Sequence, residues 1–323
     1  MPRTPVAGPS APLAPHWPAF SSDELLDVIE HVYRPGWRKA FVECRGLTFR
    51  TLVGPSGKPL NGLWTFPLFW EPVGARDDAQ PVHYLDSVCL AVTAAEAAAE
   101  RGRAAAPFVD WSGVTSWDVY VAGRTPATGV DGFTSLRRKQ RKLERDVGPV
   151  EFDFDDREQA TLETLFNWKS AQYRRTGLID LFGLQRNREF YFEMARRGLL
   201  SVATLRAGGR LVAAHAGNHI GGRFLYRLPA YDPGFARYSP GGLLTTALVH
   251  RSFEVGDREF DFLIGAEPYK FTYATHVRWI GPLGREPLAD RTQRTVRALA
   301  GRARDSWRRR AMAPSQPGLV RGG

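Results

Sequence analysis

A serine, a proline and two glycines begin a predicted helix, in the order Ser239-Pro240-Gly241-Gly242. Proline suits the first turn of a helix. Gly241 and Gly242 carry no side chain, so a ligand can approach the backbone, and N–H groups at a helix start have no acceptor within the helix. The stretch could therefore hold the pyrophosphate of a phosphorylated ligand. The alternative is an ordinary helix N-cap that binds no ligand.

Two carboxylates and a lysine follow this helix. The stretch FDFLIG predicts a strand with Phe260 and Phe262 on one face and Asp261 on the other. A carboxylate in an apolar strand loses its hydration, which raises its pKa towards the range useful for proton transfer. Asp261 could equally be a structural residue that is hydrogen-bonded to the backbone. In the following loop, Glu267 and Lys270 are expected to be exposed and able to contact a ligand.

The histidines do not indicate a metal site. His215 and His219 share one face of a predicted strand, and four residues at roughly 3.3 Å each separate them by about 13 Å. Two ligands of one metal ion lie much closer together, so we expect no bound metal. The sequence also lacks a Gly-x-Ser-x-Gly elbow, which disfavours a serine hydrolase.

The composition is that of a soluble globular protein, with 43% apolar and 24% charged residues. Cys44 and Cys89 are too few for a disulfide framework, and we expect them to be buried thiols in a reducing compartment. The sequence has no run of 18 apolar residues and no basic-then-apolar leader. These features predict a cytoplasmic protein.

The elements that must position the candidate residues occupy the second half of the chain. The pattern predicts a strand at 150–156, helices at 157–177 and 187–198, strands at 199–208, 210–222 and 223–233, a helix at 239–255, and strands at 258–265 and 271–281. Glycines at positions 177 and 198 mark the ends of the first two helices.

The first half predicts a smaller α+β unit at residues 21–131. Residues 1–20 hold six prolines and are expected to be disordered. A helix follows from residue 21, and the stretches 47–53 and 63–70 are expected to pair as a hairpin across the turn between them. We further predict a helix at 91–106 and a strand at 116–123.

Positive charge is concentrated in two segments. The helix predicted at 132–147 carries six basic residues within nine positions, from Arg137 to Arg145. It could anchor a phosphorylated ligand or polyanion, or it could be a solvated face between two domains. The tail at 285–323 holds ten arginines against three carboxylates, out of a net charge of +10. A membrane surface, an acidic partner or nucleic acid would suit this tail, as would a solvated helix packed on the body.

Several stretches together resemble a known family. AYDPGFARYSPGGLL and GDREFDFLIGAEPYKF, with TSLRRKQRKLER before a strand, are similar to the GNAT-like acetyltransferases of bacterial cellulose and exopolysaccharide synthesis, the CelD/BcsL type. The similarity runs from Phe41 to Gly281 and is sharpest from Ser135 to Lys270. That family is also similar to the Fem-type aminoacyl-transferases, which have two GNAT-like halves. The resemblance implies an α+β fold of tandem GNAT-like domains, each a mixed, mainly antiparallel sheet flanked by helices, at 21–131 and 148–284 with 132–147 as linker.

The resemblance also implies a site. Acetyl-CoA or another acyl-CoA would lie at the start of the helix, against Tyr238, Ser239, Gly241, Gly242 and Leu243. Acyl transfer needs a base for the acceptor proton and donors for the oxyanion. The candidate catalytic residues are Asp261, Glu267 and Lys270, the backbone of 223–233 would supply the oxyanion donors, and Tyr231 and Tyr269 would contact the substrate.

Three functions remain open from the sequence. The first is an acyl-CoA-dependent acyltransferase that acts on an amine or hydroxyl of a small molecule or polysaccharide precursor. The second is a Fem-type transferase that takes its acyl group from aminoacyl-tRNA, for which the basic helix would bind RNA phosphates. The third is a catalytically silent GNAT-like scaffold in envelope polysaccharide assembly. The acceptor pocket of such folds is built from loops, and the sequence does not identify the acceptor.

Overall fold

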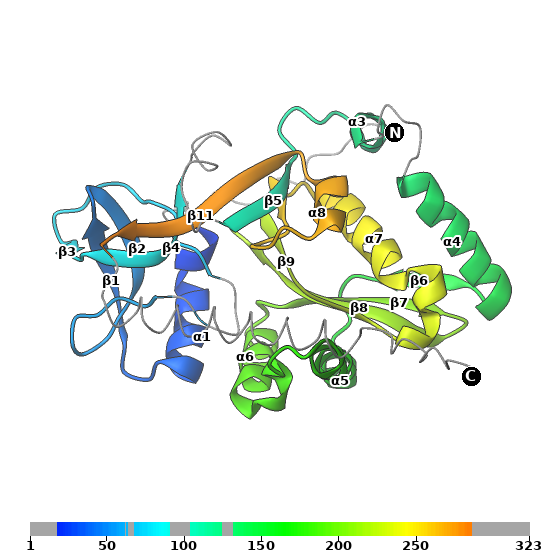
Figure 1. Cartoon of the computed structure of the whole chain (residues 1–323), viewed down its shortest axis with the longest axis horizontal. Coiled ribbons are helices and arrows are strands. Elements are labelled where there is room, and N and C mark those ends of the chain that lie inside the picture. Colours follow the sequence, from blue (N-terminus) through cyan, green and yellow to red (C-terminus); the bar gives the residue numbers. More distant parts are fainter. Residues whose placement is uncertain (1–17, 62, 64–67, 91–103, 125–131, 286–323) are drawn as a thin grey trace, which may run out of the picture.

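The chain folds around a large mixed sheet that carries helices on both faces (Figure 1). The computed structural model describes residues 18–61, 63, 68–90, 104–124 and 132–285. The helices within these ranges are α1 (Asp23–Tyr33), α3 (Trp117–Arg124), α4 (Gly132–Val147), α5 (Gln159–Thr176), α6 (Gln185–Arg196), α7 (Pro240–Val255) and α8 (Pro268–Tyr273). The strands are β1 (Arg38–Cys44), β2 (Leu47–Val53), β3 (Gln80–Pro81), β4 (Tyr84–Leu90), β5 (Ala104–Asp110), β6 (Val150–Asp153), β7 (Ser201–Ala207), β8 (Arg210–Ile220), β9 (Arg223–Tyr231), β10 (Glu259–Asp261) and β11 (His276–Gly284).

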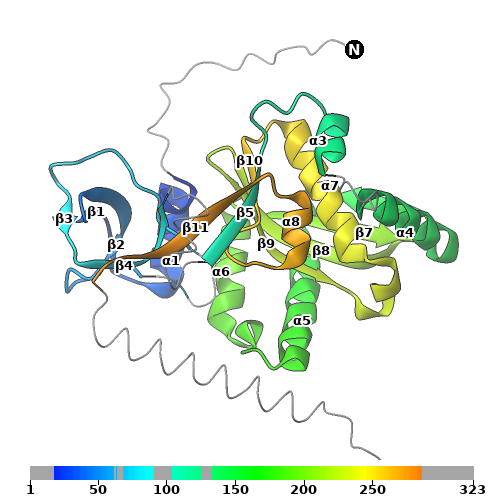
Figure 2. The same ribbon diagram turned by 45° about the horizontal axis from the view of Figure 1, so that its top comes forward.

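The large sheet has eight strands in the order β4-β11-β5-β10-β9-β8-β7-β6. Its neighbours pair antiparallel except for β9 and β10, which run parallel near the middle of the sheet. A second, three-stranded sheet in the order β2-β1-β3 lies at one end of the molecule (Figure 2). Strands β4 and β5 belong to the first half of the chain and β11 to the second, so the two halves share one sheet. The division near residue 132 stays a prediction.

Two apolar cores lie on opposite faces of the large sheet. Successive side chains of a strand point to opposite faces, so Val202 packs in the core with Phe190 of α6, whereas Ala203 packs in the other core with Leu248 of α7. Helices α1 and α5 complete the first core, and α3 and α4 the second. The sheet is therefore covered on both faces, and a ligand site must open at an edge or at a gap between strands.

The elements predicted for the second half are confirmed as far as α7. Gly177 and Gly256 adopt the left-handed conformation and end α5 and α7, which a residue with a Cβ would do at a cost. The glycine pairs 208–209 and 221–222 turn the chain between β7, β8 and β9, as their spacing predicted.

The predicted hairpin of the first half is wrong in its partner. Strand β2 pairs antiparallel with β1, the preceding segment, and Arg45 and Gly46 form the turn with positive φ angles of 54° and 76°. Of the predicted partner at 63–70, residues 64–67 lie outside the described part of the chain. A two-residue turn closes a hairpin at a lower entropic cost than the longer loop on which the prediction relied.

The predicted strand at 116–123 is also wrong, because this stretch forms α3. The Ser116 hydroxyl accepts a hydrogen bond from the Val119 N–H at 3.2 Å and so caps the helix. Trp117, Tyr120 and Val121 face the core at helical spacing. The predicted helix at 91–106 lies outside the described residues up to position 103, and its last residues begin β5.

The chain enters the core earlier than predicted. Residues 1–17 and 286–323 lie outside the described residues, but Phe20, predicted to be disordered, is fully buried and packs on Phe69 with ring centroids 4.5 Å apart. The Arg227 guanidinium lies 5.3 Å from the same ring. Phe20 is therefore part of the apolar core, although it directly follows a proline-rich segment.

The segment after α7 differs most from its prediction. The strand expected at 258–265 stops at Asp261, and Leu263 has a φ of 59°, a backbone conformation that interrupts a strand. The strand expected at 271–281 begins only at His276, because Pro268 starts the short helix α8. These two breaks create the gap in which the candidate site lies.

The structure also shows the surroundings of the two cysteines and the character of the helices. Cys44 is buried and Cys89 is half-buried, and burial raises the pKa of Cys89 to about 12. Among the helices of the described residues, none has the length and apolar character that crossing a bilayer requires.

Candidate functional site

A cavity of about 810 Å³ opens where the two parallel strands separate. Strands β9 and β10 pair only as far as Leu225 and Asp261. Beyond this point β9 continues to Tyr231, while the chain after β10 bends at Leu263. Side chains of β9, the start of α7, the segment through α8, and helices α4 and α5 line the space between them. The gap results from the interrupted pairing, so its position is set by the backbone.

The start of α7 opens onto this cavity. Ser239, Gly241 and Gly242 are among its lining residues. Ser239 has a φ of 52°, and its hydroxyl makes no capping bond to the helix; instead it accepts a hydrogen bond from the Lys139 ammonium at 2.6 Å. The first N–H groups of α7 have no acceptor within the helix. Helix dipole and lysine together make this end of the cavity electropositive.

The two glycines serve close packing as well. A Cβ on Gly241 would lie 3.3 Å from the Tyr231 ring, and one on Gly242 would lie 3.0 Å from the Leu136 side chain. Both neighbours also line the cavity. A side chain at either position would therefore displace a wall of the cavity.

Threonine hydroxyl groups fix the first turn of α7. Thr245 and Thr246 donate to the carbonyl oxygens of Gly241 and Gly242 at 2.8 and 3.0 Å. The Tyr226 hydroxyl lies 2.7 Å from the Thr245 hydroxyl. Burial holds the pKa of Tyr226 well above its ordinary value, so its hydroxyl stays protonated. Tyr226 was missed by the sequence analysis. The signal that could have found it is its place on the predicted strand at 223–233, directly before the candidate helix.

Of the residues assigned to acyl-CoA, only part reach the cavity. Ser239, Gly241 and Gly242 do, whereas Tyr238 and Leu243 are buried in the core beneath α4 and α7 and are not among the lining residues. The Tyr238 hydroxyl donates to the Asp146 carboxylate at 3.1 Å and accepts from Arg237 at 2.6 Å. Tyr238 and Leu243 therefore support the helix start from below.

Glu267, Tyr269 and Lys270 all line the cavity. Lys270 was expected to be exposed, and this is wrong: its side chain is 6% exposed because α8 turns it inwards. Its ammonium lies 2.9 Å from the Glu267 carboxylate and donates to the Ile264 carbonyl at 3.3 Å. Glu267 is 56% exposed, as expected. Tyr231 lines the same cavity, so both residues predicted to contact substrate lie there.

Asp261 does not line the cavity. It is fully buried in the sheet, where its carboxylate accepts hydrogen bonds from Arg278 at 2.9 Å and from the Leu263 N–H at 2.7 Å. Burial raises the pKa of Asp261, as expected, although the Arg278 guanidinium acts in the opposite direction. With both oxygens engaged in the sheet, the geometry favours the structural interpretation that the sequence left open.

Two further basic side chains belong to this region. Lys169 of α5 lines the cavity, and burial lowers its pKa to about 8. His215 lies behind Tyr226 with ring centroids 4.3 Å apart, and burial lowers its pKa to about 3, so the imidazole is neutral. Together with Lys139, Arg227 and Lys270, Lys169 makes four basic lining residues against the single carboxylate of Glu267 among the described residues. The cavity therefore suits an anionic ligand.

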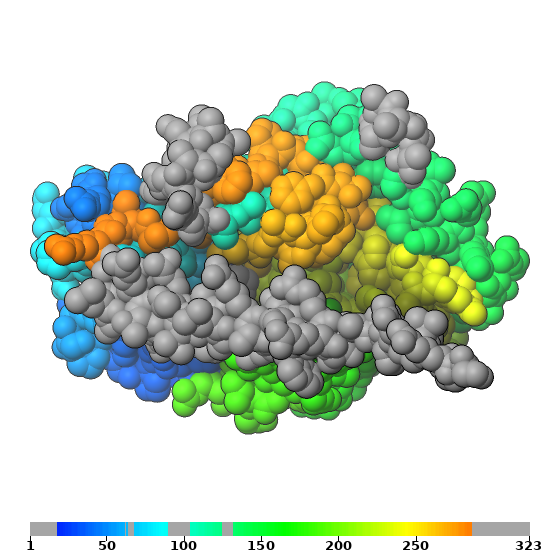
Figure 3. All heavy atoms as spheres, viewed as in Figure 1, coloured from blue at the N-terminus to red at the C-terminus, as the bar shows by residue number. Residues whose placement is uncertain are grey.

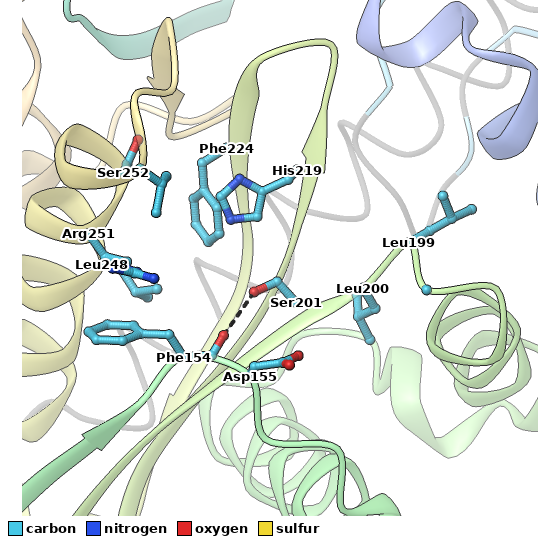
Figure 4. Close-up of a pocket in the computed structure, with 12 residues that line it drawn as sticks. Phe154, Asp155, Leu199, Leu200, Ser201, His219, Phe224, Leu248, Arg251 and Ser252 are labelled. Atoms are coloured by element: carbon cyan, nitrogen blue, oxygen red, sulfur yellow. Dashed lines mark hydrogen bonds between the residues drawn. The ribbon is translucent and has the colours of Figure 1, made fainter. Parts of the chain in front are cut away.

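A smaller cavity of about 310 Å³ lies at the other end of β9 (Figure 4). The Ser201 hydroxyl there donates to the Phe154 carbonyl at 3.3 Å. Ser252 accepts from the Trp111 indole N–H at 3.2 Å, and the His219 ring lies 3.2 Å from Asp257. In the described part of the chain, neither serine is hydrogen-bonded to a histidine or a carboxylate, and these polar groups are engaged in structural contacts. The chemistry-bearing residues gather in the larger cavity.

Residues 132–271 match the family model described as the acetyltransferase (GNAT) domain. Two solved structures are similar over most of the chain. A conserved protein of unknown function from Bacteroides thetaiotaomicron VPI-5482 has a TM-score of 0.51 and 12% identity, over 83% of this chain and 92% of that chain. FemX has a TM-score of 0.51 and 9% identity, over 82% of this chain and 92% of that chain. No curated protein matches the chain.

These similarities confirm the predicted fold class. The chain has a GNAT-like α+β fold of mixed, mainly antiparallel sheets flanked by helices, and the part that matches the acetyltransferase (GNAT) model lies within it. The match begins at Gly132, the first residue of α4, and ends at Phe271 within α8. It therefore includes all the residues that line the large cavity except Thr272 and Tyr273. The narrower resemblance to the CelD/BcsL type stays a prediction.

Proposed function

We propose that this chain is an acyltransferase that moves an acyl group from an acyl-CoA to an amine or hydroxyl of a small molecule or polysaccharide precursor. The observation that carries the proposal is the start of α7 opening onto the cavity between the diverging β9 and β10. The GNAT domain match supports the reaction class. A cytoplasmic location, where acyl-CoA is available, fits the proposal.

The residues present fit an acyl-CoA. Its pyrophosphate would bind at the N–H groups of Gly241 and Gly242, beside the Lys139 ammonium, because a helix start and a cation both favour a doubly charged anion. The cavity beyond, about 810 Å³, is large enough for a drug-sized ligand. When bound, the thioester supplies an activated acyl carbon. The polypeptide has to position this acyl carbon and to accept the proton that the acceptor loses.

Glu267 is the carboxylate best placed to accept that proton. It lines the cavity, and the Lys270 ammonium 2.9 Å away holds its position. In the balanced reaction, the acceptor nitrogen or oxygen bonds to the acyl carbon, the carbon–sulfur bond breaks, and the acceptor proton passes to Glu267. The departing thiolate takes up a proton, for which the protonated Tyr226 hydroxyl is a candidate donor. Backbone N–H groups of β9 beyond Leu225, freed from pairing with β10, are candidate oxyanion donors.

The donor site can be tested by adding one charge to it. Gly241→Asp should weaken acetyl-CoA binding at least tenfold more than Gly241→Asn, because the two side chains have the same shape and only the first repels pyrophosphate. A carboxylate in the first turn of a helix does not destabilise it. The melting temperatures of the two variants should therefore agree. Isothermal titration calorimetry measures binding, and differential scanning calorimetry measures stability.

If both variants bind acetyl-CoA as tightly as the wild type does, the donor site at α7 is contradicted. The same preparations also test the alternative donor. Purified protein that carries CoA, found by mass spectrometry, supports the proposal, whereas protein that carries tRNA, found by its absorbance at 260 nm, supports a Fem-type reaction. Protein that binds neither is expected of a catalytically silent scaffold.

A further inference from the structure

A second depression lies next to the large cavity, between α4 and the 3₁₀ helix Pro233–Tyr238. Its volume is about 700 Å³. Figure 3 shows α4, in green at one edge of this face, next to the yellow α7. The residues that line this depression are all basic: Arg138, Lys139, Arg141, Lys142, Arg145 and Arg237. We refer to it as the basic groove.

The basic groove is only partly neutralised within the protein. Arg145 pairs with Asp146 at 3.0 Å, while Arg237 donates to the Tyr238 hydroxyl and Lys139 to the Ser239 hydroxyl. In the described part of the chain, no ion pair involves Arg138, Arg141 or Lys142. Like charges in one groove repel each other, and an anionic ligand would remove this repulsion.

The basic groove and the cavity meet at one side chain. Lys139 lines both, and its ammonium is bonded to Ser239 at the start of α7. A ligand whose pyrophosphate lies at Gly241 and Gly242 can therefore continue past Lys139 into the groove. The apolar face of α4, with Phe133 and Leu143 in the core, fixes the helix in this place.

We propose that the basic groove binds the 3′-phosphate of the coenzyme A donor. The inference rests on the proposed function, because it extends the same donor beyond its pyrophosphate. A phosphomonoester carries nearly two negative charges and accepts several hydrogen bonds, for which exposed arginines are suited. Residues 1–284 outside this segment are nearly neutral, since the net charge of +10 lies mostly in the tail. A single compact groove fits one nucleotide end better than the extended phosphate path of an RNA.

The test compares CoA with dephospho-CoA, which lacks only the 3′-phosphate, by isothermal titration calorimetry. Wild-type protein should bind CoA about tenfold more tightly than dephospho-CoA, a typical effect of one charge-assisted contact. The double variant Arg138→Ala/Arg141→Ala should lose this preference and bind dephospho-CoA as the wild type does. In the part of the chain that the structure describes, neither side chain is hydrogen-bonded or ion-paired, and both are exposed, so the fold should be retained.

The matched control removes two exposed arginines elsewhere. Arg175→Ala/Arg186→Ala, at the end of α5 and the start of α6, changes the net charge equally and lies outside both depressions. It should keep the full preference for CoA. A loss of preference in this control would mean that net charge, and not the groove, causes the effect, and would overturn the inference.

The remaining outcomes separate the inference from the proposed function. If wild-type protein binds CoA and dephospho-CoA equally, the groove does not read the 3′-phosphate, although the donor site stands. If it binds neither, the proposed function fails and the inference with it. If total bacterial tRNA binds in a filter assay at 150 mM salt and the groove variant loses that binding while CoA shows no preference, the groove is an RNA site and the inference is wrong.

Discussion

Strand β10 and the segment through α8 are neighbours in the chain, but their charged residues have different surroundings. In β10, Glu259 and Asp261 lie inside the sheet, and Arg278 of β11 is paired with both carboxylates. Nine residues after Asp261, Lys270 of α8 is paired with Glu267, but these two line the cavity. The carboxylates of β10 bind partners within the protein, whereas the Glu267–Lys270 pair lines a cavity that a ligand could enter.

The difference shows why burial alone does not identify a catalytic carboxylate. Asp261 is fully buried and Glu267 is more than half exposed, and burial raises the pKa of the former. Of the two, however, only Glu267 lines the cavity. Leu263 separates them, since its positive φ ends β10 and sends the chain along the wall of the cavity. A proton acceptor needs access to the reacting group before its pKa matters.

The largest effect should follow from removing the arginine of the buried group. Arg278→Met leaves Asp261 buried without its partner, and breaking a buried ion pair in this way costs about 3–5 kcal/mol. Urea denaturation should show this loss in the free energy of unfolding. The control is Arg196→Met, whose pair with Glu193 is 61% exposed on the arginine side and should contribute about 1 kcal/mol or less. Equal losses in the two variants would mean that Arg278 stabilises the fold no more than an exposed ion pair does.

The next effect should be on turnover and should distinguish the two carboxylates. Glu267→Gln should lower kcat by about 10² to 10⁴, the usual contribution of a general base, with acyl-CoA affinity unchanged. Asp261→Asn should instead lower the free energy of unfolding by about 1–3 kcal/mol, while kcat per folded molecule stays within twofold. Steady-state kinetics on protein whose folded fraction is known checks both. The reverse result would make Asp261 the base, as the sequence also allowed.

The smallest effect concerns Lys169, which lines the same cavity as Glu267 and Lys270 but lies on α5, and it depends on pH. Below pH 8 the folded protein holds a charged, half-buried Lys169, whereas in the unfolded chain the lysine stays protonated up to about pH 10.4. Between these values the unfolded state binds more protons, so the contribution of Lys169 to stability rises with pH. Lys169→Met should therefore raise the melting temperature by about 2 °C at pH 7.

This gain should shrink as the pH rises above 8 and vanish near pH 10.4. Thermal unfolding of both proteins across that range measures it. A gain that does not change with pH would indicate better packing of methionine, and would contradict the lowered pKa of Lys169.

The sequence by itself determined much of the second half of the chain. Helical periodicity and terminal glycines predicted α4 to α7, and paired glycines predicted the turns between β7, β8 and β9, because these signals act over a few residues. The glycine and proline pattern at Ser239 likewise predicted the helix start that opens onto the cavity. The fold class followed from the resemblance of the stretches between Ser135 and Lys270 to a known family.

The tertiary structure alone decided which of the candidate residues share a site. Asp261 and Lys270 lie in one short segment and were both predicted as site residues. Arg278, 17 residues beyond Asp261, holds the aspartate in the sheet. Helix α8, in contrast, turns the lysine into the cavity. Tyr226 and Lys169 join the site from β9 and α5, and Phe20 packs on Phe69, 49 residues further along the chain. These pairings depend on the interrupted contact between β9 and β10 and on long-range packing, whereas a sequence pattern records only the preferences of neighbouring residues.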